Sequence, residues 1–218
     1  MYAHVVSRLA DAAGMAGCFV DYRLAPKHPF PAASDDALTA YRALLDQGID
    51  PAKIALAGDS AGGNLCFSLL HRIGQLGLPM PGAVAAMSPV IDMTGASPSI
   101  ISNRKSDLLL AYNWGQRAQR DYLNGASETD PIASPIFGSF NGAPPVMIQV
   151  ATSEMFYDDS RRMAAKLRED GVNVRLDEWE DVFHVWHLNA GRSPEADQGI
   201  ADLAAFLRQV IAARAAQR

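Results

Sequence analysis

Short apolar runs alternate with longer amphipathic segments along the whole chain. The short runs, bounded by turn residues, predict strands at 17–22, 54–57, 83–87 and 146–150, and an alternation of apolar and polar residues predicts another at 172–179. Apolar residues spaced three or four positions apart predict helices at about 5–13, 32–47, 61–74, 106–123, 158–171 and 194–213. Because strands and helices alternate, we expect an α/β fold, with a mostly parallel sheet covered by helices on both faces. No internal repeat or low-complexity linker breaks this pattern, which indicates a single domain over residues 1–218.

Composition and net charge argue against some classes of binding partner. Hydrophobic residues make up 49% of the 218 and charged residues 20%, which is typical of a globular domain with a substantial core. The net charge of −5 and the lack of a basic run argue against binding to nucleic acid or to an anionic membrane surface. No stretch approaches the roughly 20 apolar residues that span a bilayer, and residues 1–14 lack the pattern of a signal peptide.

The two cysteines, Cys18 and Cys66, lie in apolar segments. We interpret them as buried thiols rather than as a disulfide or a metal-binding pair. Reduced thiols fit the cytoplasm, which is the location we expect. The sequence predicts no metal site and no cofactor.

A serine lies on a glycine-rich turn between the strand 54–57 and the helix that follows it. Residues 58–63 read G-D-S-A-G-G, with Ser60 as the serine and Asp59 before it. Glycines at both two-residue offsets, Gly58 and Gly62, are expected to remove collisions with the strand and the helix. This is the G-x-S-x-G pattern of a nucleophile elbow in its strand-turn-helix setting.

The same turn can also hold negative charge. The N–H groups that open the helix point at the region of Ser60, with the positive end of the helix dipole behind them. We expect the Ala61 N–H to donate to an oxyanion there. The alternative is structural, since Ser60 could instead be only the N-cap of the helix.

An activated serine needs a base, and the base needs an orienting acid. Of the five histidines, His184 and His187 come just after the last predicted strand. Functional residues gather at the carboxyl ends of strands in open parallel sheets, which favours this loop. Either histidine could also be a loop residue that bonds to the backbone.

The acid is expected beyond the carboxyl end of the strand 146–150. Glu154 lies nearest to that end, whereas Asp158 lies where a helix N-cap is expected and is the alternative acid. The chain order is then Ser60, Glu154, His184. Nucleophile, acid and base follow one another in this order in α/β-hydrolases, unlike in chymotrypsin or subtilisin.

The chain resembles the hormone-sensitive-lipase-like esterases, a branch of the α/β-hydrolase fold, over nearly its whole length. Residues 21–32 are similar to the family's Y-R-L-A-P-E-x-P-F-P-A signature, and residues 58–63 to its G-D-S-A-G-G elbow. Residues 130–135 resemble the segment that leads into its acid strand. His184 matches the closing F-x-H motif, and Glu154 falls where the family usually has aspartate.

The resemblance implies a serine carboxylesterase that hydrolyses short to medium acyl esters through an acyl-enzyme. Ser60 would attack the ester carbonyl, His184 would carry the proton and Glu154 would orient the imidazole. Residues 91–125 would form part of a helical cap and the acyl pocket, although a plain connecting helix is the alternative. Homodimers of the family pair through the last strand and helix, so this chain could do so too.

Two other functions share these residues. A protein of this fold can hold a ligand without turnover, as the plant gibberellin receptors do. A triad can also cleave an amide or a carbamate, and the three side chains alone do not distinguish these bonds from esters. Retention of Ser60, His184 and an acid favours the esterase interpretation.

One departure from the family pattern concerns the oxyanion hole. The family carries an H-G-G-G run upstream of the first helix, and this sequence has none. Loss of one oxyanion donor typically costs about 100- to 1,000-fold in rate. The strand that leads into that run would lie between 17–22 and 54–57, and its absence would leave a gap of roughly 10 Å with two exposed edges. We therefore expect an incomplete α/β-hydrolase domain without its first strands, a fragment or a reading frame started too late, with weak activity.

Overall fold

A four-stranded parallel sheet forms the centre of the fold. The computed structural model describes residues 2–215. The strands lie side by side in chain order: β1 (Ala55–Asp59), β2 (Ala83–Met87), β3 (Val146–Ala151) and β4 (Val174–Trp179). All three neighbouring pairs are parallel. The predictions for these four strands are confirmed, with boundaries within about two residues.

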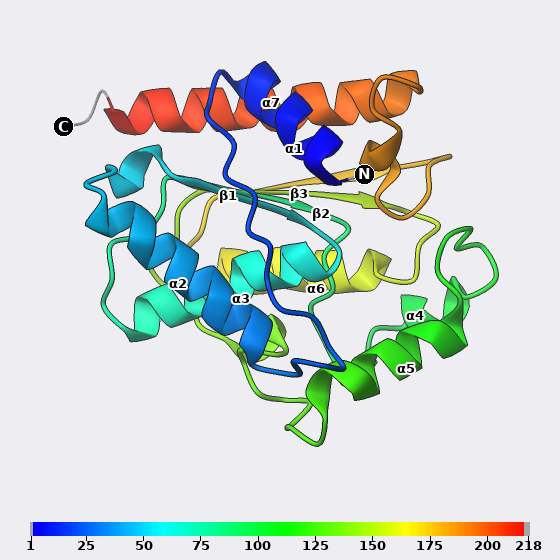
Figure 1. The fold of residues 1–218 in the computed structure, drawn as a ribbon. Coiled ribbons are helices and arrows are strands. Elements are labelled where there is room, and N and C mark those ends of the chain that lie inside the picture. Colours follow the sequence, from blue (N-terminus) through cyan, green and yellow to red (C-terminus); the bar gives the residue numbers. More distant parts are fainter. Residues whose placement is uncertain (1, 216–218) are drawn as a thin grey trace.

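Helices cover both faces of this sheet (Figure 1). On one face lie α1 (Tyr2–Ala13) and α7 (Pro194–Ala215), and on the other lie α2 (Ala32–Asp46), α3 (Ala61–Gln75) and α6 (Tyr157–Glu169). The short α4 (Ser99–Ser102) contacts α6, and α5 (Tyr112–Leu123) lies outside these layers. Three 3₁₀ turns complete the fold: η1 (Pro51–Lys53), η2 (Pro135–Phe137) and η3 (Trp186–Asn189).

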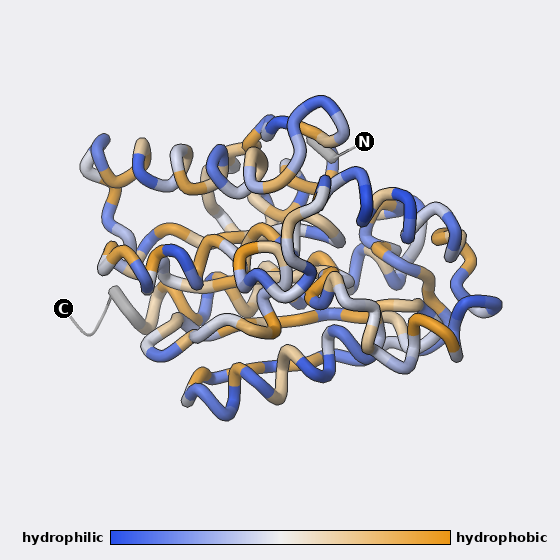
Figure 2. The backbone as a smooth tube through the Cα atoms, turned by 90° about the horizontal axis from the view of Figure 1, so that it is seen from below, coloured by the Kyte–Doolittle hydropathy of each residue, from blue (hydrophilic) through white to orange (hydrophobic). Residues whose placement is uncertain are grey.

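The two faces of the sheet bury separate apolar clusters. In β2, Ala83, Ala85 and Met87 join the cluster beneath α1 and α7, whereas Val84 and Ala86 join the cluster beneath α3 and α6. A strand that is buried on both faces reads as a continuous apolar run, which is why its sequence predicted it so well. Figure 2 shows hydrophobic and hydrophilic positions alternating along the helices, as expected for helices with one face on a core.

The prediction of a strand at 17–22 is wrong. Residues 16–24 have no regular secondary structure and pass the β1 edge of the sheet without pairing to it (Figure 1). A strand needs a neighbour for its backbone hydrogen bonds, and the described sheet ends at β1. Phe19 is 54% exposed, and Cys18 is exposed rather than buried, whereas Cys66 is buried as predicted.

Two helix predictions also need correction. The helix expected at 106–123 begins only at Tyr112, because Asp107 accepts hydrogen bonds from the backbone of Leu109 and Leu110 and holds a turn there. The N-cap of α6 is Phe156, so Asp158 lies inside the first turn instead of at the cap. Within residues 2–215 no helix combines the length and apolar character needed to cross a bilayer.

Candidate active site

Ser60 joins β1 to α3 in a strained backbone conformation. Its φ is 49° and its ψ is −113°, and residues other than glycine rarely adopt a positive φ. Three backbone hydrogen bonds hold it there. The Ser60 N–H donates to the Met87 carbonyl (2.9 Å), and the Ser60 carbonyl accepts from the N–H groups of Asn64 (3.1 Å) and Val90 (3.2 Å). Surrounding structure of this kind is what maintains strain at a functional turn.

Glycine is required at two positions of this turn, one of which differs from the prediction. A Cβ on Gly58 would lie 2.3 Å from the Gly62 carbonyl oxygen, and one on Gly63 would lie 2.8 Å from the Pro89 Cβ. A Cβ on Gly62 would meet nothing within 4 Å. The expected steric need for glycine therefore holds at Gly58, fails at Gly62 and applies instead to Gly63.

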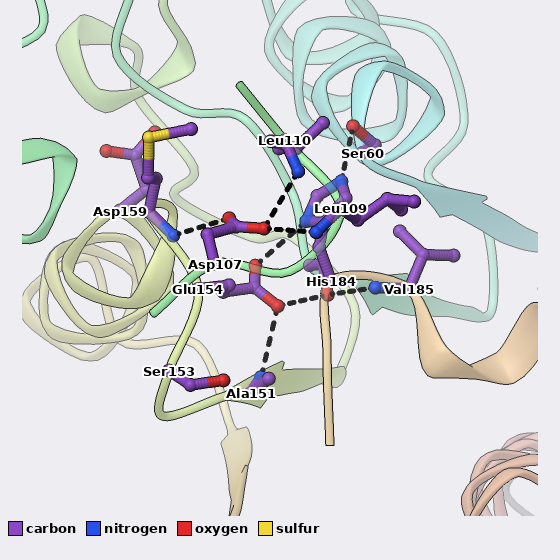
Figure 3. A network of polar contacts seen from close by, with 12 residues as sticks. Ser60, Asp107, Leu109, Leu110, Ala151, Ser153, Glu154, Asp159, His184 and Val185 are labelled. Atoms are coloured by element: carbon purple, nitrogen blue, oxygen red, sulfur yellow. Dashed lines mark hydrogen bonds and ion pairs between the residues drawn. The ribbon is translucent and has the colours of Figure 1, made fainter. Parts of the chain in front are cut away.

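Three side chains from distant parts of the chain form one hydrogen-bonded series (Figure 3). The Ser60 Oγ lies 3.0 Å from His184 Nε2, and His184 Nδ1 lies 3.1 Å from Glu154 Oε1. Glu154 is completely buried and His184 is 2% exposed, so solvent does not compete for these contacts. With a proton on Nδ1, the imidazole donates to the carboxylate and its Nε2 accepts from the serine hydroxyl, which is the arrangement that lets a serine lose its proton.

The other candidate residues lie outside this series. Asp158 accepts from the Ser99 N–H (2.9 Å) and forms an ion pair with Arg161 (3.7 Å). The Nε2 of His187 pairs with the side-chain oxygen of Gln149 at 2.7 Å. Burial lowers the pKa of His187 to about 3, so this ring stays neutral within the core.

Ser88 is a polar residue of this site that the sequence did not predict. It follows β2, is fully buried and has a φ of 48°. Its hydroxyl donates to Glu154 Oε2 (2.8 Å) and accepts from the Val185 N–H (3.1 Å). The Ala151 N–H also donates to Glu154 Oε2, at 3.2 Å. Ser88 thus ties the acid to the loop that carries His184, and a serine before a proline at a strand end gave no signal of this role.

The start of α3 adds electrostatic character to the site. Ala61 is the first residue of α3, and the first four N–H groups of a helix have no acceptor within it. Burial raises the pKa of the Asp59 carboxyl next to the serine, which favours its neutral form. Among the described residues, no three His, Cys, Asp or Glu side chains come together as a candidate metal site.

Comparison with known proteins adds to this geometry. A family described as alpha/beta hydrolase fold matches residues 1–188. An acetyl-hydrolase of Streptomyces hygroscopicus is 39% identical over 94% of this chain and 69% of its own length. An esterase of Acinetobacter venetianus is 37% identical over 93% of this chain and 67% of its own length. The crystal structure of an esterase from the bacterial hormone-sensitive lipase family superposes with a TM-score of 0.93 at 39% identity, over 95% of this chain and 70% of that one.

Proposed function

Because the chain belongs to the hormone-sensitive-lipase branch of the α/β-hydrolase family and is a serine carboxylesterase, we propose that Ser60, His184 and Glu154 are its catalytic triad. The observation that carries this proposal is the buried hydrogen-bonded series from Ser60 Oγ through the imidazole to Glu154. Nothing in the relatives named above favours the non-catalytic alternative, since they are an acetyl-hydrolase and esterases.

The proposed reaction has two halves. Ser60 Oγ bonds to the ester carbonyl carbon while its proton passes to His184 Nε2. The imidazolium then returns that proton to the leaving alcohol as the carbon–oxygen bond breaks, which leaves an acyl-serine. Water repeats the sequence and releases the acid. Glu154 accepts a hydrogen bond from His184 Nδ1–H and stabilises the imidazolium, and the Ala61 N–H donates to the oxyanion.

The test compares ester hydrolysis by the wild-type chain and two serine variants. We expect Ser60→Ala to lower kcat for p-nitrophenyl acetate at least about 1,000-fold, because the nucleophile is lost. Ser127→Ala is the matched control, since the hydroxyl of this exposed serine bonds to the side chain and the N–H of Thr129 rather than to the triad. Turnover that is equal in the wild type and Ser60→Ala would refute the assignment.

The acyl preference is also a proposal. The acetyl-hydrolase among the relatives supports a site for short acyl groups. We expect kcat/KM to be higher for p-nitrophenyl acetate and butyrate than for the dodecanoate. A maximum at the dodecanoate would contradict a short-chain preference without affecting the triad.

We further propose one domain over residues 1–218, with a cap formed by about 91–125. Apolar clusters on both faces of a single sheet support the first part. The second is supported by the exposed apolar residues of this segment, which include Leu108 at 82% and Trp114 at 62% exposure. Limited proteolysis tests the arrangement: cleavage is expected first within 91–125, with the remainder staying folded.

Two properties of the whole protein stay proposals of the same kind. We propose a homodimer that pairs through β4 and α7, because within residues 2–215 β4 has a strand neighbour on one side only. Light scattering after gel filtration tests it, and a monomer at micromolar concentration would refute it.

We also propose a cytoplasmic location, supported by two free cysteines of which Cys18 is exposed. Cell fractionation tests the location.

A further inference from the structure

The turn that carries Glu154 is held from outside by another turn of the chain. Residues 152–155 follow β3, and residues 103–107 follow α4 and lie against them. Four hydrogen bonds join side chains of the second turn to the main chain of the first. They connect Asn103 Nδ2 with the carbonyls of Thr152 (2.9 Å) and Glu154 (3.0 Å), Ser106 Oγ with the carbonyl of Ser153 (3.0 Å), and Asp107 Oδ2 with the N–H of Met155 (2.9 Å).

These contacts hold the peptide unit directly after Glu154 at both of its polar atoms. Its carbonyl oxygen accepts from Asn103, and its N–H, which belongs to Met155, donates to Asp107. A peptide unit is planar, so fixing both atoms fixes its orientation. The peptide unit before Glu154 is held too, because the Ser153 carbonyl accepts from Ser106, and the two units together set the direction of the Glu154 side chain.

The second oxygen of Asp107 holds a different segment. Asp107 Oδ1 accepts from the N–H groups of Leu109 (3.0 Å) and Leu110 (2.9 Å). In the view of Figure 3, Leu109 and Leu110 are drawn toward the side on which Ser60 lies, away from Ala151. Leu109 is 52% exposed, so packing against other side chains does little to fix its position. Hydrogen bonds to an ionised carboxylate are roughly twice as strong as neutral ones, which suits Asp107 to this task.

We propose that Asp107 is a positioning residue with two functions: one oxygen fixes the turn that aims Glu154 at His184, and the other holds Leu109 as an apolar wall of the acyl site. The inference rests on the proposed function, because it assigns roles in the same triad. It explains why one carboxylate bridges the acid turn and the segment that passes beside the nucleophile.

Two substitutions separate the two functions. Asp107→Asn keeps the shape of the side chain but has only one accepting oxygen. That oxygen can accept either from the N–H groups of Leu109 and Leu110 or from the N–H of Met155, but not from both groups. The two leucine N–H groups outnumber the single one of Met155, so we expect the oxygen to face the leucines. Asp107→Ala removes both contacts. Asp130→Asn is the matched control, because Asp130 accepts from the N–H of Ile132, two residues ahead, as Asp107 accepts from that of Leu109.

The rates are measured with p-nitrophenyl acetate and butyrate and divided by the number of active sites, titrated with a phosphonate. We expect Asp107→Asn to lower kcat about 10-fold for both esters, with KM within about 2-fold of the wild type. We expect Asp107→Ala to lower kcat as much and also to change the butyrate-to-acetate ratio of kcat/KM at least about 3-fold. Leu109→Ala is expected to change that ratio in the same direction.

Each result bears on one idea. If the wild type is active and depends on Ser60, but both Asp107 variants keep its kcat, Asp107 does not position the acid. A change in KM alone, with kcat unchanged, overturns the same claim. If the butyrate-to-acetate ratio of kcat/KM is unchanged in both Asp107→Ala and Leu109→Ala, Leu109 does not form a wall of the acyl site. If Asp107→Ala does not fold, Asn103→Ala tests the same peptide unit, and a normal kcat there also counts against the inference. Lack of Ser60-dependent turnover in the wild type would instead reject the proposed function.

Discussion

The chemistry of this protein depends on where single polar atoms are held. Ser60 and Ser88 both have a positive φ, and each ends a neighbouring parallel strand. One presents its hydroxyl to His184, and the other presents its hydroxyl to Glu154. The second oxygen of Glu154 accepts from the Ser88 hydroxyl and from the Ala151 N–H, so Ser88 is the side chain that holds this oxygen.

We predict that Ser88→Ala lowers kcat about 10- to 100-fold while KM changes little. The hydroxyl is lost from a buried, ionised carboxylate, a kind of hydrogen bond worth about 1.5–3 kcal/mol, and each 1.4 kcal/mol corresponds to tenfold in rate. The measurement is hydrolysis of p-nitrophenyl butyrate. Ser34→Ala serves as the control, because Ser34 is equally buried but bonds to Ser68 and Arg72 instead. Equal kcat values for Ser88→Ala and the wild type would mean that the Ser88 hydroxyl is not needed to hold Glu154.

At the scale of elements, α6 anchors the segment that follows β2. Asp159, in the first turn of α6, accepts from the N–H groups of Ile91 (2.7 Å) and Asp92 (3.2 Å) and from the Ser97 hydroxyl. Arg162, one turn later, forms an ion pair with Asp92 at 2.7 Å. The segment that begins the proposed cap is therefore attached to the helix behind the acid turn.

This anchor makes stability depend on pH. Burial raises the pKa of Asp159 from 3.8 to about 6. Between these values the native carboxyl keeps its proton while the unfolded one has lost it, so the native state binds more protons and its stability falls as pH rises. The contribution is complete below about pH 4 and is lost by about pH 6.

We predict that Asp159→Asn becomes more stable relative to the wild type as pH rises through this window. Asparagine resembles the protonated acid, so the difference in unfolding free energy should grow by up to about 3 kcal/mol from pH 4 to pH 7. Urea denaturation at each pH measures it. The difference between the two proteins is the informative quantity, because buried His187 has a lowered pKa and destabilises both as pH falls. The exposed Asp46→Asn is the control, and a difference that stays constant with pH would contradict the prediction.

For the whole molecule, one sheet separates two apolar layers. Ile200 belongs to the cluster beneath α1 and α7, and Ile148 belongs to the cluster beneath α3 and α6. Side chains on opposite faces of a sheet do not share a cavity. The two layers should therefore contribute to stability independently, as separate sites generally do.

We predict that Ile200→Val and Ile148→Val each cost about 0.5–1.5 kcal/mol. Their sum should match the double variant within about 0.5 kcal/mol. Urea denaturation of the wild type, both single variants and the double variant completes the cycle. A coupling above about 1 kcal/mol would show that repacking on one face is transmitted through the sheet to the other.

Sequence patterns predicted the periodic parts of this protein. The apolar runs at 54–57, 83–87 and 146–150 correspond to three strands, because strands buried in a sheet consist of apolar residues over a short length. The segment 172–179, in which apolar and polar residues alternate, corresponds to the fourth strand, which is half-buried at the edge of the sheet. The same reasoning failed at 17–22, where an apolar run lies exposed beside the sheet edge. An apolar run records the capacity to form a strand, whereas pairing needs a neighbour that sequence periodicity does not show.

The sequence by itself determined the type of site: a serine on a glycine-rich turn, an acid after a strand and histidines after the last strand, in the order of an α/β-hydrolase. Only the tertiary structure decided which side chains meet. It placed Glu154 rather than Asp158 against His184, and brought in Ser88 and Asp107 from 66 and 48 residues away from their partners. Local patterns arise from neighbours along the chain, but a hydrogen bond of this kind exists only when separate elements have packed, and no spacing in the sequence encodes that distance.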